Sequence, residues 1–355
     1  MYNKKMIRKF QLSILFILLS FVFSSEIWFT IDTSQNEEMK KISQAFFPND
    51  IIRVFYWDNG LKEMTKLIKA GHKPNVLLTG HTFVPYIANV DSRFDHVEPL
   101  FLDIRALYLW GVPKIIPVSR WRDVLFYAQS HPDFIAFPKL WTSNKLYNFL
   151  SFFNDQLPFW ISQTPFSTQN MIYTVKLMYK LIDNYPMIFK ENPEESFLKK
   201  ENKAIISGIW MLNLLRQQDA EFSVFDVPAS QNGVRGFKGA YVGIFFKNDE
   251  ETNAIKDTLR SYEFQEKTWK ILNQLPTNQQ LKAHLQETDS KVNKLYEISE
   301  YSPWATSIEP KKLEERTDVL NFLLKNKKNY QDIDEKNMNK FFNNRIYFKF
   351  MKLLH

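Results

Sequence analysis

The stretch that decides the fold is Glu26-Ile27-Trp28-Phe29-Thr30-Ile31, a short run of β-branched and aromatic residues that predicts a strand. After it, Ser34 and Glu37 stand three residues apart, the spacing of a capping box at a helix start. Apolar residues then recur at helical spacing between residues 39 and 46. We therefore expect a strand followed directly by a helix.

The same alternation repeats further along the chain. Residues 51–57 form a nearly continuous apolar run that ends in the turn sequence Asp58-Asn59-Gly60. Residues 61–68 return to the helical period, and residues 75–78 are another short apolar run. Strands alternating with helices predict an α/β fold with a parallel sheet.

Three polar segments directly follow the predicted strands: Ile31-Asp32-Thr33, Trp57-Asp58 and Thr79-Gly80-His81. Ligands of open parallel sheets bind beyond the carboxyl ends of the strands. We therefore expect these three segments to lie along one rim of the sheet.

Beyond residue 100 the patterns predict a strand at 106–110, helices at 145–154 and 168–184, a strand at 241–246, and a helix opened by Asn248 and Glu251. No internal repeat and no low-complexity linker is found, so composition does not mark a domain boundary.

The first 24 residues predict a secretory signal peptide. Four cations within residues 4–9 precede an uncharged apolar run from Leu12 to Phe23, and the small residue Ser24 follows. The expected cleavage site is Val22-Phe23-Ser24, which gives a periplasmic or otherwise extracytoplasmic protein. The alternative is an uncleaved membrane anchor lengthened by residues 27–29.

Composition excludes several functions. The chain has no cysteine, which excludes disulfides, thiol catalysis and a lipid anchor on cysteine. Loss of the four leader cations would reduce the net charge from +7 to +3, and no basic stripe suggests nucleic acid. The six histidines lack metal-ligand spacing, and no nucleophile elbow or phosphate loop occurs. We expect no metal, no cofactor and no enzymatic activity.

Four segments resemble the extracellular solute-binding proteins of family 1, the group that includes maltose-binding proteins. Residues 197–210, Phe-Leu-Lys-Lys-Glu-Asn-Lys-Ala-Ile-Ile-Ser-Gly-Ile-Trp, are similar to the family's F-x-x-G-K-A-A-M-x-I-S-G-x-W segment, with Asn202 in place of its glycine. Residues 239–248 are similar to the strand that crosses back between lobes, and residues 254–266 to the helix after it. Residues 117–125 resemble a family helix start, whereas residues 97–117 are compressed relative to the family.

The resemblance implies a two-lobe, periplasmic-binding-protein-like fold of type II, with a hinge and a ligand cleft between the lobes. It places the first lobe at residues 26–107 plus 245–305 and the second at 108–244 plus 306–355. It also implies the solute-binding subunit of an ABC transporter, a monomer that delivers a sugar or oligosaccharide to a membrane permease.

Sugar binding needs aromatic faces for the C–H groups of the ring and planar polar side chains for its hydroxyls. The candidates of these types are Trp210, Trp57, Asp58, His81, Tyr241, Asp32 and Trp110. The resemblance places Trp210 at the cleft. For Trp57 core packing is an equal alternative, and for His81 a surface position without a ligand is. Core packing is the favoured interpretation for Trp110 and Trp141.

Two other functions remain open. The first is the binding of a different solute by the same fold, such as an amino compound, and several acids lining the cleft would favour it. The second is an exported interaction or scaffold protein that has lost solute binding, which a filled cleft would favour. An exported hydrolase lacks support, since nothing fixes the spacing of Asp32, Asp58 and Asp103 for acid–base chemistry.

Overall fold

Three parallel strands at the start of the chain build the sheet of the first unit. In the computed structural model they are β1 (Glu26–Ile31), β2 (Ile51–Tyr56) and β3 (Val76–Gly80). β1 lies between the other two, with Ile31 beside Tyr56 and Phe29 beside Leu78. The strand predicted at residues 26–31 is confirmed, and the other two shift by one or two residues.

The structure describes residues 25–111, 119–142, 145, 148–149, 151–152, 176, 179–229, 233, 235–302, 304, 317–318, 321–322 and 324–325. The expected signal peptide, most of the helices predicted at 145–154 and 168–184, and nearly all of residues 306–355 lie outside this part of the chain. Among the described residues, no helix has the length and hydrophobicity needed to cross a membrane.

The chain folds into two compact units. Unit 1 comprises residues up to Phe101 together with Ala240–Lys282, and unit 2 comprises Leu102–Gly239 together with residues from Ala283 onward. The first lobe was expected to end at residue 107, resume at 245 and end again at 305. The last limit differs most, because α15 (Ser290–Tyr301) packs on β9 (Phe222–Phe225) of unit 2.

The sheet of unit 1 has the order β11-β4-β10-β3-β1-β2. β4 (His96–Ile104) and β10 (Lys238–Phe245) also extend beyond the unit's limits, and β11 is Leu275–Pro276. β10 runs antiparallel to β3, so the sheet is mixed and not purely parallel. The strand predicted at 241–246 is therefore present, three residues longer at its start.

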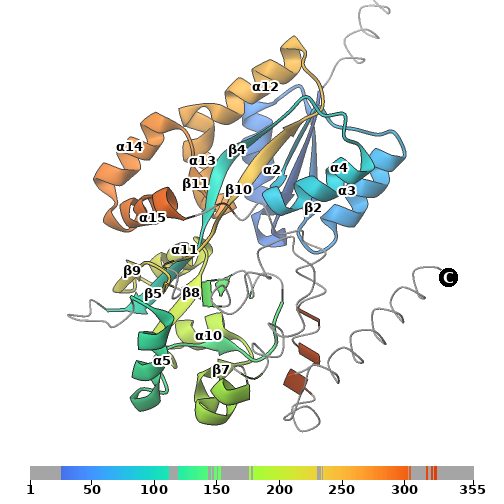
Figure 1. Ribbon diagram of the computed structural model, residues 1–355. Helices are drawn as coiled ribbons and strands as arrows, with labels where there is room; N and C mark the ends of the chain where they lie inside the picture. The colour runs from blue at the N-terminus through green and yellow to red at the C-terminus, as the bar shows by residue number, and fades with distance from the viewer. Residues whose placement is uncertain are drawn as a thin grey trace, which may run out of the picture. The chain divides into compact units, whose positions relative to one another are not determined.

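Helices cover both faces of this sheet (Figure 1). α3 (Gly60–Lys69) and α4 (Val84–Val90) pack on one face, where Trp28, Leu77 and Ile244 belong to the same apolar core as Met64 and Ile87. α2 (Asn36–Phe46) and α13 (Tyr262–Leu272) contact each other, with Phe46 edge-on to Phe264 at 5.3 Å between ring centroids. The remaining elements of the unit are η1 (Thr33–Gln35), η2 (His81–Phe83), α12 (Glu250–Arg260) and the start of α14 (Gln279–Thr288).

Both predicted helix starts were wrong by one or two residues. The capping box joins Asp32 and Gln35 and not Ser34 and Glu37, because the short 3-10 turn η1 precedes α2. At α12 the cap is Asp249, whose side chain accepts a hydrogen bond of 2.8 Å from the backbone N–H of Thr252.

Unit 2 is built around a three-stranded antiparallel sheet of order β8-β5-β9. β5 (Ala106–Trp110) matches the predicted strand, and β8 is Ala204–Ser207. α10 (Pro193–Leu198) packs on β8, and α11 (Trp210–Gln217) begins three residues after it. The described part of unit 2 also contains α5 (Trp121–Ser130), β6 (Phe137–Pro138), η3 (Pro186–Ile188) and β7 (Phe189–Lys190).

Candidate functional site

The carboxyl ends of β1, β2 and β3 meet at one edge of unit 1, as the sequence predicted. The register places Ile31 beside Tyr56, and the backbone N–H of Trp57 donates to the carbonyl of Ile31 at 3.3 Å. On the other side of β1, β3 continues two residues beyond Leu78, the partner of Phe29, and ends at Gly80. We call this edge, with Asp32, Trp57, Asp58, His81 and Tyr241, the rim of unit 1.

Trp57 is the half-buried aromatic residue of the rim. Its ring stands edge-on to Phe83 at 5.5 Å and to Tyr241 at 6.2 Å. A Cβ at Gly80 would lie 3.3 Å from two carbon atoms of the indole, so Gly80 leaves the space into which the ring settles. The indole is thus held in place while part of it still faces solvent.

Tyr241 lies beneath Trp57 as a core residue. It is 3 % exposed, it packs against Phe101, and its hydroxyl donates to the carbonyl of Thr30 at 2.9 Å. Burial raises the pKa of this hydroxyl above its ordinary value. Tyr241 therefore supports Trp57, with its hydroxyl already bonded inside the protein.

Asp32 and Asp58 are exposed carboxylates on the rim. Partial loss of hydration raises the pKa of Asp32, and the neighbouring charge of Asp58 raises it further. Two negative charges close enough to repel each other beside an indole suit hydrogen-bond donors or a cationic group.

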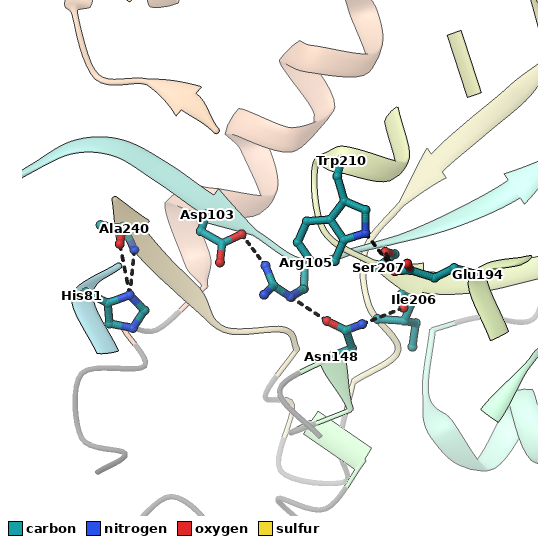
Figure 2. A network of polar contacts seen from close by, with 9 residues as sticks. All are labelled: His81, Asp103, Arg105, Asn148, Glu194, Ile206, Ser207, Trp210 and Ala240. Atoms are coloured by element: carbon teal, nitrogen blue, oxygen red, sulfur yellow. Dashed lines mark hydrogen bonds and ion pairs between the residues drawn. The ribbon is translucent and has the colours of Figure 1, made fainter. Parts of the chain in front are cut away.

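His81 binds the backbone of a neighbouring strand. Its Nδ1 lies 3.1 Å from the backbone nitrogen of Ala240 and 3.2 Å from the Ala240 carbonyl oxygen (Figure 2). The neutral tautomer with a free Nδ1 lone pair accepts from the N–H, whereas the other tautomer donates to the carbonyl. In either case His81 fastens η2 to β10.

Trp210 lies at the start of α11 in unit 2, half-buried. Its Nε1–H donates to a carboxylate oxygen of Glu194 at 2.8 Å, and the Ser207 hydroxyl donates to the same oxygen at 2.6 Å (Figure 2). A Cβ at Gly208 would lie only 2.0 Å from an indole carbon, so the ring rests directly against this glycine. These contacts fix the orientation of the indole.

Arg105 is the functional candidate that sequence reasoning missed. It is 5 % exposed, and its guanidinium carbon lies 4.8 Å from the centroid of the Trp210 ring. Its Nε donates to Asn148 at 2.6 Å, Asn148 donates to the Ile206 carbonyl at 3.3 Å, and its Nη1 pairs with Asp103 (Figure 2). The only sequence signal was an acid and a base two residues apart, Asp103 and Arg105, just before the strand predicted at 106–110.

Tyr108 adds a buried hydroxyl to this region. The residue is fully buried, and burial raises the pKa of its hydroxyl. Among the described residues, that hydroxyl has no hydrogen-bond partner. We call Asp103, Arg105, Glu194, Ser207 and Trp210 the Trp210 group.

Trp110 is separate from the Trp210 group. It ends β5, whereas Arg105 precedes β5, so roughly 16 Å separates their backbones at about 3.3 Å per residue. The Trp110 indole packs on Phe197 at 5.1 Å between centroids and donates to the Phe197 carbonyl at 2.8 Å. The expectation that Trp141 belongs to the core is confirmed by its exposed fraction of 1 %.

The two sets of residues share one chemical pattern. In each unit a half-buried indole is fixed beside planar polar groups, which are carboxylates in unit 1 and a guanidinium–carboxylate pair in unit 2. Within the described residues, no cluster of His, Asp and Glu side chains is arranged to hold a metal ion. Each of the two sets can bind a small polar molecule through the face of its indole ring and paired hydrogen bonds.

Solved structures show that the fold is that of known solute-binding proteins. The maltose-maltodextrin binding protein of Alicyclobacillus acidocaldarius is 14 % identical, with a TM-score of 0.67 over 92 % of this chain and 100 % of that one. The cyclic α-maltosyl-1,6-maltose binding protein of Arthrobacter globiformis is 14 % identical, with a TM-score of 0.62 over 89 % and 96 %. An ABC transporter solute-binding protein of Thermotoga lettingae, solved with α-D-tagatose bound, is 13 % identical, with a TM-score of 0.64 over 90 % and 97 %.

No family model matches the chain, and no curated protein matches it by sequence. The α/β fold of the solute-binding proteins, which the sequence resemblance implied, is confirmed.

Proposed function

We propose that this chain is the extracytoplasmic solute-binding subunit of an ABC transporter and that its ligand is a sugar or oligosaccharide. The observation that carries the proposal is the Trp210 group, in which Glu194 and Gly208 hold a half-buried indole beside a buried guanidinium. The similarity in fold to proteins solved as maltodextrin-binding and tagatose-bound supports it.

In this proposal the indoles supply the surfaces on which sugar rings stack. C–H groups on one side of a pyranose carry a weak positive charge, which the negative face of an indole attracts. Trp57 presents such a surface on the rim of unit 1, and Trp210 presents one in unit 2. Tyr241 and Gly80 position Trp57, and they need not touch the ligand.

The planar polar groups supply the hydrogen bonds. A guanidinium paired with a carboxylate offers donors and acceptors side by side, which matches two neighbouring hydroxyls. Arg105 and Asp103 form such a pair in unit 2, and Asp32 and Asp58 add acceptors on the rim. All the proposed contacts are non-covalent, and the partner that would receive the ligand is an ABC permease in the membrane.

A thermal-shift screen of residues 25–355 against mono- and oligosaccharides, polyols and amino compounds tests the proposal. A sugar at about 100 times its dissociation constant should add about 2.7 kcal/mol to the free energy of unfolding. A chain that folds and is stabilised by no sugar would refute the assignment of sugar as ligand.

Substitutions then locate the contacts. We expect Trp57→Ala and Trp210→Ala each to weaken sugar binding by about 1–3 kcal/mol by calorimetry, as for a buried aromatic contact. Trp110→Phe is the control, because the Trp110 indole packs on Phe197 and donates to its carbonyl. This substitution should leave the affinity unchanged. Unchanged affinity in a well-folded Trp210→Ala variant would remove Trp210 from the site.

One observation favours a second candidate, a cationic solute. Asp32 and Asp58 stand close enough for the Asp58 charge to raise the pKa of Asp32, beside the indole of Trp57. Carboxylates with an aromatic face are a common recognition set for amines. Stabilisation by amino compounds but not by neutral sugars, lost in Asp58→Asn, would establish this candidate in place of the sugar.

A further inference from the structure

The start of β1 holds a pair of carboxylates, Asp50 and Glu251, beside Ser25. Ser25 immediately precedes β1 and is 2 % exposed. Its hydroxyl donates to Glu251, in the first turn of α12, at 3.0 Å. Its carbonyl accepts from the backbone N–H of Ile51 at 2.9 Å, which continues the ladder of β1 and β2 by one residue and sets Ser25 beside Asp50.

The two carboxylates are close to Ser25 and to each other. Burial raises the pKa of Asp50, a hydrogen bond from the Ser25 backbone lowers it, and the charge of Glu251 raises it again. In the described part of the chain, neither carboxylate forms an ion pair with a lysine, arginine or histidine. Two like charges therefore lie beside Ser25, and no cation among the described residues pairs with either of them.

The sheet limits where the chain can be cut. All six residues of β1 are buried, and β1 is paired on both sides, with β2 and with β3. Cleavage beyond Ser25 would therefore remove part of an inner strand. On the amino-terminal side of Ser25, the sequence pattern of a secretory leader ends at Ser24.

We propose that the chain is processed between Ser24 and Ser25, and that Asp50 and Glu251 bind the new α-ammonium group of Ser25. Hydrolysis of this peptide bond by a signal peptidase leaves a carboxylate on Ser24 and an amine on Ser25. That amine is protonated at neutral pH, since α-amino groups have pKa values near 8. The ammonium group supplies the cation that the two carboxylates lack, so the processed chain is the more stable form.

Neither carboxylate belongs to the residues proposed to bind the ligand. Asp50 and Glu251 instead form a site for the mature amino terminus. The neighbouring charged residues at the start of α12 have other contacts. The Asp249 carboxylate caps the helix by accepting from the Thr252 N–H, and the charge of Lys247 helps to lower the pKa of Asp249.

The charge can be removed without changing the length of the chain. The test compares residues 25–355 carrying a free Ser25 amine with the same protein acetylated on that amine. We expect acetylation to lower the melting temperature by about 2–4 °C. In an Asp50→Asn/Glu251→Gln variant, which keeps the oxygen acceptors, the two forms should melt at the same temperature. Glu250→Gln, an exposed neighbour on the same turn, is the control and should retain the difference.

Two results would overturn the inference. One is an equal melting temperature for the free and acetylated forms of the unsubstituted chain, or a difference that persists in the double variant. The other is a protein recovered after export whose mass gives a start other than Ser25. A start at Ser25 together with a charge-dependent melting temperature supports it.

Discussion

Replacing Gly208 by alanine tests whether the orientation of Trp210 depends on the missing side chain. The added Cβ would lie 2.0, 2.4 and 2.5 Å from three carbons of the indole, whereas carbon atoms in contact stay about 3.5 Å apart. The ring must therefore move by more than about 1 Å. The substitution itself adds no backbone strain, because Gly208 is not among the residues with positive φ.

The magnitude follows from the contacts that the displaced ring loses. The hydrogen bond from Trp210 Nε1 to the Glu194 carboxylate contributes about 1.5–3 kcal/mol. The contact with the Arg105 guanidinium contributes about 0.5–2 kcal/mol. Since part of both is regained as the ring settles elsewhere, we expect Gly208→Ala to lower the free energy of unfolding by about 2–4 kcal/mol.

Urea unfolding followed by circular dichroism measures this loss. In a Trp210→Leu background the clashing ring atoms are absent, so Gly208→Ala should there cost less than about 1 kcal/mol, and the difference is the coupling between the two residues. A Gly208→Ala variant within about 0.5 kcal/mol of the parent, or an equal cost in both backgrounds, would show that the ring does not rest against Gly208.

Three further predictions concern buried hydroxyls and the rim. Tyr241→Phe should lower the free energy of unfolding by about 0.5–1.5 kcal/mol, because it removes the hydrogen bond to the Thr30 carbonyl. Tyr108→Phe should not lower it, because the Tyr108 hydroxyl has no hydrogen-bond partner among the described residues. The urea midpoints of the two variants test this. Burial raises the pKa of Tyr108, Tyr241 and Tyr296. The unfolded chain therefore loses these protons near pH 10 while the folded chain keeps them, so the free energy of unfolding should fall as pH rises above about 10, and a constant value from pH 9 to 11 would contradict this. Asp32→Asn should stabilise the protein at pH 7 by less than about 1 kcal/mol and not at pH 3, because the raised pKa of Asp32 makes its ionised form the costly one. Equal effects at both pH values would argue against a raised pKa of Asp32.

Some helix boundaries could not be read from spacing alone. Ser34 and Glu37 have the right separation for a capping box, yet Asp32 and Gln35 form it. Both pairs are compatible with local sequence rules. The choice depends on where β1 ends and the chain turns, and that is fixed by the pairing of β1 with β2 and β3.

The sequence by itself determined the features that depend on neighbours along the chain. β-branched and aromatic runs placed β1 and β5 at their observed bounds, and the alternation of strands with helices predicted the α/β class. It also placed Asp32, Trp57 and His81 at strand ends, because a strand end is a local property.

Only the tertiary structure decided which distant residues meet. β10 enters the first sheet beside β3, about 160 residues earlier in the sequence, and in antiparallel orientation. Arg105 contacts the ring of Trp210, and Trp210 at the start of α11 donates to Glu194 of α10. Tyr241 and Trp110 each form a hydrogen bond to a backbone carbonyl inside the protein. Such contacts are set by the packing of whole elements against one another, and local propensity carries no information about it.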